Sequence, residues 1–544
     1  MKPAIDPFQL EVLRHALTGI AEEMSFVVMR AARSPLLREA GDLSSALTDA
    51  RGELVAQGRD IPVHLGVMSF TVGAFLKIVP PEKLQPGDVW YTNLPELGGN
   101  HLPDVKAIRP IFADGKLICF AVSLAHWADI GGGWPGSYVA NATESLQEGL
   151  RLPPLRLFTE AGPDAEKIAV IMHNVRGAVE REGDMLAQMA ATRTAEQRIL
   201  ELCRVHGTST VEAAMAALHD RSEGAMRAAI RSLPQGVFTG EDFLDDDGPG
   251  GAAAAVRVRI TVADDRANFD FSETDDALTG PLNTTPYVTA AAVYYAIKAI
   301  AGPEIQPNGG CYRPLTVITR PGSLLNPPLE RPLVGGNHET SQRLVDAIFR
   351  AFAHAIPERL SAGGSTTAGL LIFGGKGRDG AWKTLYEPHG GGEGARHDRG
   401  GAAATRVHLT NTNNTPAEII EAEFPIQILH HKLREGSGGA GLHHGGDGSE
   451  RAYAVLAPEM SLTTMFERRV IPPWGLSDGA TGAPFHCALH HQDGRVQELR
   501  GKANLMVQEG DVVIFKTSGG GGYGKVGAGT ANAPLGAYFS TLDR

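Results

Sequence analysis

Apolar residues recur every three or four positions through the first thirty residues of the chain, which is the spacing of one face of an α-helix. Asp6 followed by Pro7 is typical of a helix start, because a carboxylate caps the first turn and proline is tolerated at the first helical position. We therefore predict a long amphipathic helix at the amino end. Its apolar face comprises Phe8, Leu10, Leu13, Leu17, Ile20, Met24, Val27 and Ala31.

Further along the chain, alternating or continuous apolar runs predict strands, and helical spacing returns between them. A hairpin is expected over residues 43–56, with its turn at 49–52. Other predicted strands are 87–91, 107–112, 116–124, 256–262, 268–271 and 317–319. Predicted helices are 64–78, 288–301 and 341–355, and helix formers dominate 165–219. From residue 363 the chain is glycine-rich and strand-like.

These elements predict an α/β fold of the mixed α+β type. We expect a large multi-layer body, with long helices in the amino-terminal half and a glycine-rich, strand-rich carboxy-terminal part. A length of 544 residues suggests about three folding units. No linker composition separates them, and we place them at 1–230 (long helices and a metal site), 231–360 (mixed α/β) and 361–544 (glycine-rich strands).

Composition narrows the class of protein. The net charge of −12 repels phosphate backbones and anionic lipid, so we expect no nucleic-acid partner and no membrane association. The four cysteines lie far apart and form no CxxC pair, which indicates a reducing compartment. No apolar run reaches about 18 residues, and the first residues lack the apolar core of a signal peptide. We therefore expect a soluble cytoplasmic protein.

Two His-x-x-Asp pairs are the strongest sign of chemistry. His101 with Asp104, and His126 with Asp129, flank predicted strands and lie beside glycines. Imidazole and carboxylate are common ligands of Zn²⁺, Mn²⁺ or Fe²⁺, so the two pairs can converge on one divalent ion. Asp42, before the first hairpin, can complete a set of four ligands. The alternative is that these residues only cap turns around buried glycines.

Nucleotide-binding motifs are missing from the sequence. There is no Gly-x-x-x-x-Gly-Lys-Ser/Thr phosphate loop. Residues 519–524 satisfy Gly-x-Gly-x-x-Gly, but no βαβ unit has room to follow, so we interpret them as a structural turn. His338-Glu339 does not extend to the His-Glu-x-x-His motif of zinc proteases.

Several long motifs, in order along essentially the whole chain, resemble the hydantoinase B/oxoprolinase family. This family contains the B subunits of ATP-dependent hydantoinases and 5-oxoprolinases, with related carboxylase subunits. One departure is Thr92-Asn-Leu-Pro-Glu, where the family usually has Thr-Asn-Asp-Pro-Tyr. The matching motifs are Asp42-Leu-Ser-Ser-Ala-Leu, Ile61-Pro-Val-His-Leu-Gly, Gly98-Gly-Asn-His-Leu-Pro-Asp, Ala125-His-Trp-Ala-Asp-Ile-Gly-Gly, Gly280-Pro-Leu-Asn, Gly335-Gly-Asn-His-Glu-Thr-Ser-Gln-Arg, Thr410-Asn-Thr-Asn-Asn-Thr-Pro and Ser437-Gly-Gly-Ala-Gly.

The resemblance implies a divalent metal held by Asp42, His101, Asp104 and His126. It makes Asp129 a residue that orients a ligand or acts as a base. His64 is a further candidate for the catalytic pocket, although a histidine there can equally cap a buried helix. ATP and Mg²⁺ would bind to a partner, an A-type ATPase subunit, in an α2β2 assembly.

The implied activity is hydrolysis of a cyclic amide, such as a hydantoin, a lactam or 5-oxoproline, after the partner has phosphorylated it. The alternatives are a subunit of an ATP-dependent ketone carboxylase, a non-catalytic scaffold for the A-type subunit, and a metallohydrolase that acts alone. We also expect the glycine turns at 98–99 and 131–133 to let backbone amides approach the substrate.

Overall fold

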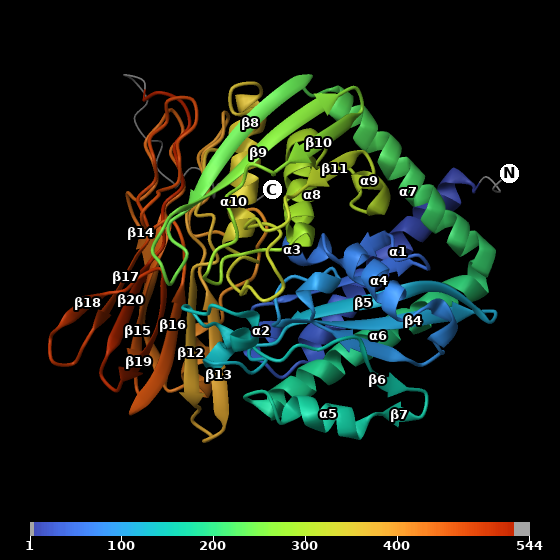
Figure 1. Ribbon diagram of the computed structural model, residues 1–544, viewed down its shortest axis with the longest axis horizontal. Coiled ribbons are helices and arrows are strands. Elements are labelled where there is room, and N and C mark those ends of the chain that lie inside the picture. Colours follow the sequence, from blue (N-terminus) through green and yellow to red (C-terminus); the bar gives the residue numbers. More distant parts are fainter. Residues whose placement is uncertain (1–4, 527–544) are drawn as a thin grey trace, which may run out of the picture.

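The computed structural model describes residues 5–526 and has the mixed helix-and-sheet fold that the sequence predicts. Four sheets organise it (Figure 1): a seven-stranded sheet near the amino end, a four-stranded sheet in the middle of the chain, and sheets of four and five strands in the carboxy-terminal part. Among the described helices, none is both long and apolar enough to cross a bilayer.

The seven-stranded sheet has the order β2-β1-β5-β4-β3-β6-β7. The long hairpin β4/β5 lies at its centre, so both strands are paired on each side and almost wholly buried. In this antiparallel pair Asp104 lies directly opposite His126. The strands are β1 (Leu43–Asp49), β2 (Leu54–Gln57), β3 (Val89–Thr92), β4 (Asp104–Ala113), β5 (Lys116–His126), β6 (Leu155–Thr159) and β7 (Gly162–Pro163).

Two long helices, α1 and α6, pack together over one face of this sheet and bury a shared apolar core. The Asp6 carboxylate accepts the Gln9 backbone N–H at 3.0 Å, which confirms the predicted cap. The helix-rich stretch 165–219 is not continuous: the chain breaks at Gly207, whose φ of +86° favours glycine. The helices of this half are α1 (Pro7–Ala31), α2 (Pro35–Arg38), α3 (Pro62–Leu65), α4 (Met68–Ile78), α5 (Ala165–Met172), α6 (Ala178–His206) and α7 (Thr208–Arg231).

The middle of the chain forms the sheet β11-β10-β9-β8, against which α10 packs. α7 leads up to it along one side of the molecule (Figure 1). The elements are β8 (Gly236–Leu244), β9 (Ala254–Ala263), β10 (Arg266–Asp270), β11 (Leu315–Ile318), α8 (Pro286–Ala301), α9 (Gly309–Tyr312) and α10 (Thr340–Phe352).

The last two sheets, β13-β12-β16-β19 and β14-β15-β20-β17-β18, enclose a common core in which Phe373 of one sheet contacts Tyr453 of the other. They form the stack of long strands at the left of Figure 1. The elements are β12 (Leu370–Lys376), β13 (Trp382–Pro388), α11 (Ala417–Glu423), β14 (Ile426–Arg434), β15 (Gly448–Val455), β16 (Glu459–Met465), β17 (His486–His490), β18 (Val496–Glu498), β19 (Lys502–Gln508) and β20 (Val512–Lys516).

The glycines of this part let loop backbones touch. A Cβ at Gly392 would lie 1.9 Å from the Gly446 carbonyl oxygen and 2.3 Å from the Gly520 nitrogen. Residues 519–524 are therefore packed between other loops, as expected for a structural turn. Loop residues Arg406 and Thr412 of the carboxy-terminal part line a cavity together with His126, at the end of β5.

Candidate metal centre

His101, Asp104 and His126 converge at the buried end of the β4/β5 hairpin. One ligand atom from each lies within 4.8 Å of the other two. Asp104 is the first residue of β4 and His126 the last of β5, and their pairing across the ladder fixes their separation. His101 lies in the turn before β4. The two predicted pairs therefore contribute to one cluster, but only three of their four residues belong to it.

Unpartnered nitrogen atoms show that this cluster suits a cation. His101 Nδ1 must donate to the Val334 carbonyl, 2.9 Å away, because a carbonyl oxygen only accepts. His101 Nε2 then lies 3.0 Å from Asp104 Oδ1 without a hydrogen bond between them, and His126 Nε2 also lacks a partner within residues 5–526. Buried polar atoms without partners are costly. A divalent ion would satisfy both nitrogens and the carboxylate together.

The charges of the cluster are strongly coupled. Burial opposes ionisation of Asp104, but His101 and His64 beside it hold the pKa of the carboxyl well below its usual value. Burial likewise opposes protonation of His101, but Asp104 raises the pKa of the ring. A cation placed between the two would compete with that proton, as metal binding at imidazole ligands generally does.

Asp42 and His64 lie beside this cluster. His64 Nε2 is 3.5 Å from Asp104 Oδ2 and 3.9 Å from Asp42 Oδ1. Burial lowers the pKa of His64 to about 4 and raises that of Asp42 to about 6. Both residues line a cavity of about 30 Å³ together with His101 and His126, which we call the metal cavity because it adjoins the candidate ligands. The structure thus brings together five of the six residues proposed from the sequence.

Asp129 is the exception. Its Oδ1 accepts the backbone N–H groups of Gly131 and Arg176, and its Oδ2 accepts that of Gly136 and the Arg176 guanidinium. It does not line the cavity. Because β5 ends at His126, Asp129 lies in the following loop and holds that loop in place. The structure therefore differs from the expectation that Asp129 orients a ligand or acts as a base.

The glycine turns also differ from expectation. A Cβ at Gly98 would lie 2.3 Å from the Phe70 carbonyl carbon, and one at Gly132 would lie 2.6 Å from the Gln147 carbonyl oxygen. Neither glycine lines the cavity. These glycines therefore allow segments of this chain to approach each other. Leu94, where the sequence departs from the family motif, does not line the cavity either.

Sequence reasoning missed a chain of hydrogen bonds that begins at the cavity wall. The Tyr386 ring packs against His126, with centroids 4.6 Å apart. Tyr386 Oη is 3.0 Å from Tyr138 Oη, which is 3.0 Å from His338 Nε2, and His338 Nδ1 is 3.0 Å from Glu339 Oε1. The only sequence signal was the motif Gly335 to Arg343, which carries His338 and Glu339 but gives no sign of the two tyrosines.

Burial keeps this chain of side chains uncharged. It raises the pKa of both tyrosines well above the usual value, lowers that of His338 well below, and raises that of Glu339 to about 8. A protonated Glu339 can donate to His338 Nδ1, which leaves His338 Nε2–H to donate to Tyr138 and Tyr138 to donate to Tyr386. The proton of Tyr386 is then free for the cavity.

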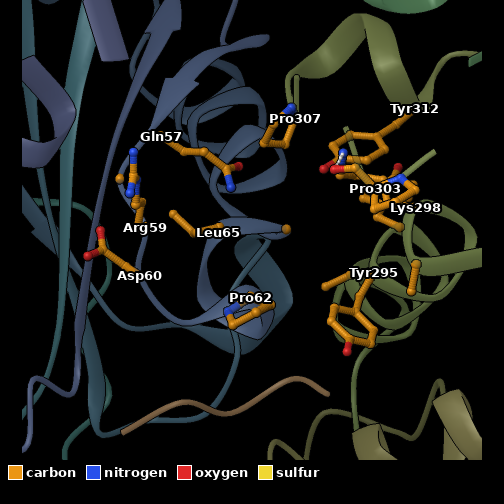
Figure 2. A pocket seen from close by; sticks show the side chains of 15 residues that line it. Gln57, Arg59, Asp60, Pro62, Leu65, Tyr295, Lys298, Pro303, Pro307 and Tyr312 are labelled. Carbon is orange, nitrogen blue, oxygen red and sulfur yellow. Dashed lines mark hydrogen bonds between the residues drawn. The ribbon is translucent and has the colours of Figure 1, made fainter. Parts of the chain in front are cut away.

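A larger recess of about 400 Å³ lies on the other face of α3 (Figure 2). Asp60, Pro62 and Leu65 line it, whereas Ile61, Val63 and His64 line the metal cavity. Its opposite wall is built around α8, with Tyr295, Lys298 and Tyr312 labelled in Figure 2. The recess is mostly apolar and is separated from the metal cavity by one helical turn.

The chain is similar to several known proteins. A family model described as hydantoinase B/oxoprolinase matches residues 6–526. 5-oxoprolinase 1 of Arabidopsis thaliana is 34% identical over 547 residues, which cover 95% of this chain but 42% of the plant protein. Caprolactamase subunit beta of Pseudomonas jessenii is 30% identical over 535 residues, which cover 96% of this chain and 91% of the subunit.

Solved structures show the same fold. The crystal structure of the ATP-dependent caprolactamase from Pseudomonas jessenii matches with a TM-score of 0.90 and 28% identity, over 96% of this chain and 92% of the other. A nucleotide-free acetone carboxylase structure matches with a TM-score of 0.88 over 95% of this chain and 76% of the other. Its identity of 18% shows likeness of fold alone.

Proposed function

Because this chain belongs to the hydantoinase B/oxoprolinase family, we propose that it is the B-type subunit of an ATP-dependent cyclic-amide hydrolase. The observation that carries the proposal is the buried cluster of His101, Asp104 and His126, whose unpartnered nitrogens suit a divalent ion. The relatives named 5-oxoprolinase and caprolactamase support the class of substrate, a ring closed by an amide bond.

Asp42, His101, Asp104 and His126 would hold the divalent metal, which is Zn²⁺, Mn²⁺ or Fe²⁺ on the chemistry of these donors. When bound, the ion supplies Lewis acidity and lowers the pKa of bound water towards neutral pH. His64, kept neutral by burial, lines the same cavity and offers a lone pair to a proton of the attacking water. Its position in this cavity supports a catalytic role for His64 within the proposal.

The partner would be an A-type ATPase subunit, which holds ATP and Mg²⁺. The name of the caprolactamase relative, a beta subunit of an ATP-dependent enzyme, supports such a division of labour. Amides resist hydrolysis because resonance stabilises them. Phosphorylation of the amide oxygen removes that resonance and makes the carbon more electrophilic, so water adds to it more easily. Breaking the C–N bond would then leave an acyl phosphate, which a second water hydrolyses to the open-chain carboxylate and inorganic phosphate. An α2β2 assembly remains part of the proposal.

Tyr386 is placed to supply a proton to the ring nitrogen as the C–N bond breaks. The hydrogen-bonded chain through Tyr138 and His338 to Glu339 would replace that proton. Proton transfer of this kind typically contributes about 10²–10⁴-fold to a rate. The chain is neutral throughout, so a proton can pass along it without leaving a buried charge at either tyrosine.

The test is an assay of the full chain with its A-type partner on 5-oxoproline, a hydantoin and caprolactam, with and without ATP. We expect hydrolysis only when ATP and the partner are both present. His101→Ala and Asp104→Asn should lose bound metal, measured by elemental analysis, together with turnover. His173→Ala, an exposed histidine on the loop after α5, is the matched control and should keep both.

Other outcomes would replace the proposal. Turnover without ATP would indicate a metallohydrolase that acts alone, and bicarbonate-dependent consumption of a ketone would indicate a carboxylase subunit. A wild-type chain that binds no metal under metal-replete conditions would indicate a scaffold. Full activity of both variants would refute the assignment of the site.

A further inference from the structure

The metal cavity is too small for a cyclic amide. A volume of about 30 Å³ accommodates about one or two water molecules. The rest of any substrate must therefore occupy an adjoining space. A second cavity, of about 130 Å³, meets this requirement because Arg406 lines both.

Three residues that line the second cavity carry buried polar atoms with no partner within residues 5–526. These atoms are Arg406 Nη2, His408 Nε2 and Arg396 Nε. All three are nitrogen atoms, and the two guanidinium nitrogens can only donate hydrogen bonds. Unsatisfied buried donors gathered around one cavity indicate a ligand that accepts hydrogen bonds.

Two backbone carbonyls hold the Arg406 guanidinium in place, and its positive charge has no carboxylate partner among the described residues. Its Nη1 donates to the Ala368 carbonyl at 2.8 Å and its Nε to the Thr412 carbonyl at 3.3 Å. No carboxylate among the described residues lies within 4.0 Å of its guanidinium. Burial lowers its pKa to about 10, so it stays charged at neutral pH. A buried cation without a nearby carboxylate favours an anionic ligand.

His408 is fixed in an unusual backbone conformation, with a φ of +54°. Its ring packs edge-on against Tyr295 and Phe349. Burial lowers its pKa to about 4, so the ring is neutral. Tyr295 Oη and His408 Nδ1 lie 3.4 Å apart. In the tautomer in which the hydroxyl donates to Nδ1, the ring proton lies on Nε2, the atom without a partner. Such strain at a polar residue is typical of binding sites.

Arg396 completes the set at the more exposed side. Its Nη2 lies 3.4 Å from Glu393 Oε1, which also lines the cavity. Arg359, exposed and also lining the cavity, adds positive charge. The balance of charged lining residues is therefore three arginines against one glutamate, which favours an anion.

We infer that this cavity is an oxyanion subsite for the substrate. It binds either a carboxylate that the cyclic amide carries or the phosphoryl group added by the partner. Arg406 lies between this anion and the metal cavity, so the anion would be held next to the reacting carbon. The inference rests on the proposed function, because it assumes that the reaction takes place at the metal cluster.

The subsite also adjoins the recess of Figure 2. Tyr295 and Ala299 line both spaces. The apolar walls of that recess, including Leu65 and Tyr312, would accommodate hydrocarbon parts of a substrate whose anion reaches Arg406. This arrangement predicts selectivity for cyclic amides that present an oxyanion.

The experiment titrates the full chain with inorganic phosphate, and in a parallel arm with acetate, by calorimetry. We expect binding in at least one arm, weakened about tenfold or more in Arg406→Gln and His408→Phe, because each removes a buried donor to a charged ligand. Arg399→Gln, an exposed arginine on the loop that carries Arg396, should bind as the wild type does. Phosphate preference indicates the phosphoryl group, and acetate preference indicates a substrate carboxylate.

Asp104→Asn separates this inference from the proposed function. It should keep anion binding, because the subsite does not include the metal ligands, and the titration needs neither ATP nor the partner. Loss of anion binding in Asp104→Asn would overturn the inference by placing the anion on the metal. Unchanged binding in Arg406→Gln and His408→Phe, or no binding of either anion to the wild type, would also overturn it. If Arg406→Gln does not fold, as judged by circular dichroism, Arg396→Gln takes its place with the same expectation.

Discussion

Glu148 supports His101 through a single residue, Val334. Glu148 Oε1 accepts the backbone N–H of Val334 at 2.8 Å, and the carbonyl of Val334 accepts His101 Nδ1 at 2.9 Å. The same carboxylate accepts the backbone N–H of Leu333. Glu148 therefore sets the orientation of a proposed metal ligand that it does not touch.

Replacing Glu148 with alanine should weaken metal binding about 10–100-fold while all proposed ligands remain, as loss of such supporting groups typically does. The reason is that the 333–334 backbone loses its anchor and the His101 ring loses its fixed orientation. Competition with a chelating dye measures the affinity. Glu166→Ala, on the exposed first turn of α5, is the control. An affinity equal to that of the wild type would show that Val334 holds His101 without Glu148.

Replacing Tyr386 with phenylalanine should lower kcat about 10²–10⁴-fold with unchanged metal content, because only the hydroxyl at the cavity end of the hydrogen-bonded chain is lost. Steady-state kinetics with the partner and elemental analysis measure the two quantities. Tyr287→Phe is a matched control, since Tyr287 Oη donates to the Glu96 carbonyl away from the cavity. A kcat close to that of the wild type would remove Tyr386 from the proton path.

The raised pKa of the Asp60 carboxyl predicts that the stability of the protein depends on pH. Burial raises its pKa from 3.8 to about 6, although Ser25 Oγ and the Ser45 N–H donate to it. A carboxyl whose pKa is raised by folding stabilises the protein fully below about pH 4, and this stabilisation is lost as the pH rises through about 6. Asp60→Asn, which never ionises, should therefore be more stable than the wild type by about 1–2 kcal/mol at neutral pH.

Thermal unfolding of Asp60→Asn and the wild type across this pH window tests the sign. The difference in midpoint should be largest near pH 7 and should shrink towards pH 4. Asp379→Asn, in an exposed turn, should show no such trend. A constant difference at every pH would mean that Asp60 has an ordinary pKa.

Arg468 joins three parts of the chain. Its Nη2 lies 2.6 Å from Asp242 on β8 and 2.6 Å from Asp346 on α10, and all three side chains are buried. Arg468→Met leaves two buried carboxylates with weaker pairing, so we expect a loss of about 3–5 kcal/mol in the free energy of unfolding. Chemical denaturation measures it. The neighbouring exposed Arg469→Met should cost little, and an equal cost for both would refute the assignment.

The predicted elements rested on local patterns, and those patterns identify the parts of the site that are local. His101 and Asp104 are three residues apart, and His126 ends the strand paired with Asp104, so hydrophobic patterning was enough to suggest their convergence. Asp129 has the same spacing from His126, but the strand ends before it. Spacing alone does not reveal which residue turns into a loop.

The residues that sequence reasoning missed come from far along the chain. Tyr386 lies on β13 and packs against His126. Arg406 lies in a loop after β13 and lines the cavity. Neither lies in a periodic pattern that indicates chemistry, and their positions depend on how the last two sheets pack against the first. Only the folded structure brings such residues together.

The walls of the metal cavity come from residues as far apart in the chain as Asp42 and Thr412. During synthesis the imidazole and carboxylate donors emerge early, whereas the side chains that enclose them emerge hundreds of residues later. Acquisition of the proposed ion would thus be a late step of maturation, and a truncated or partly synthesised chain would exchange metal freely with its surroundings. Retained metal would then report a completed chain, which offers a simple quality measure for any preparation of this protein.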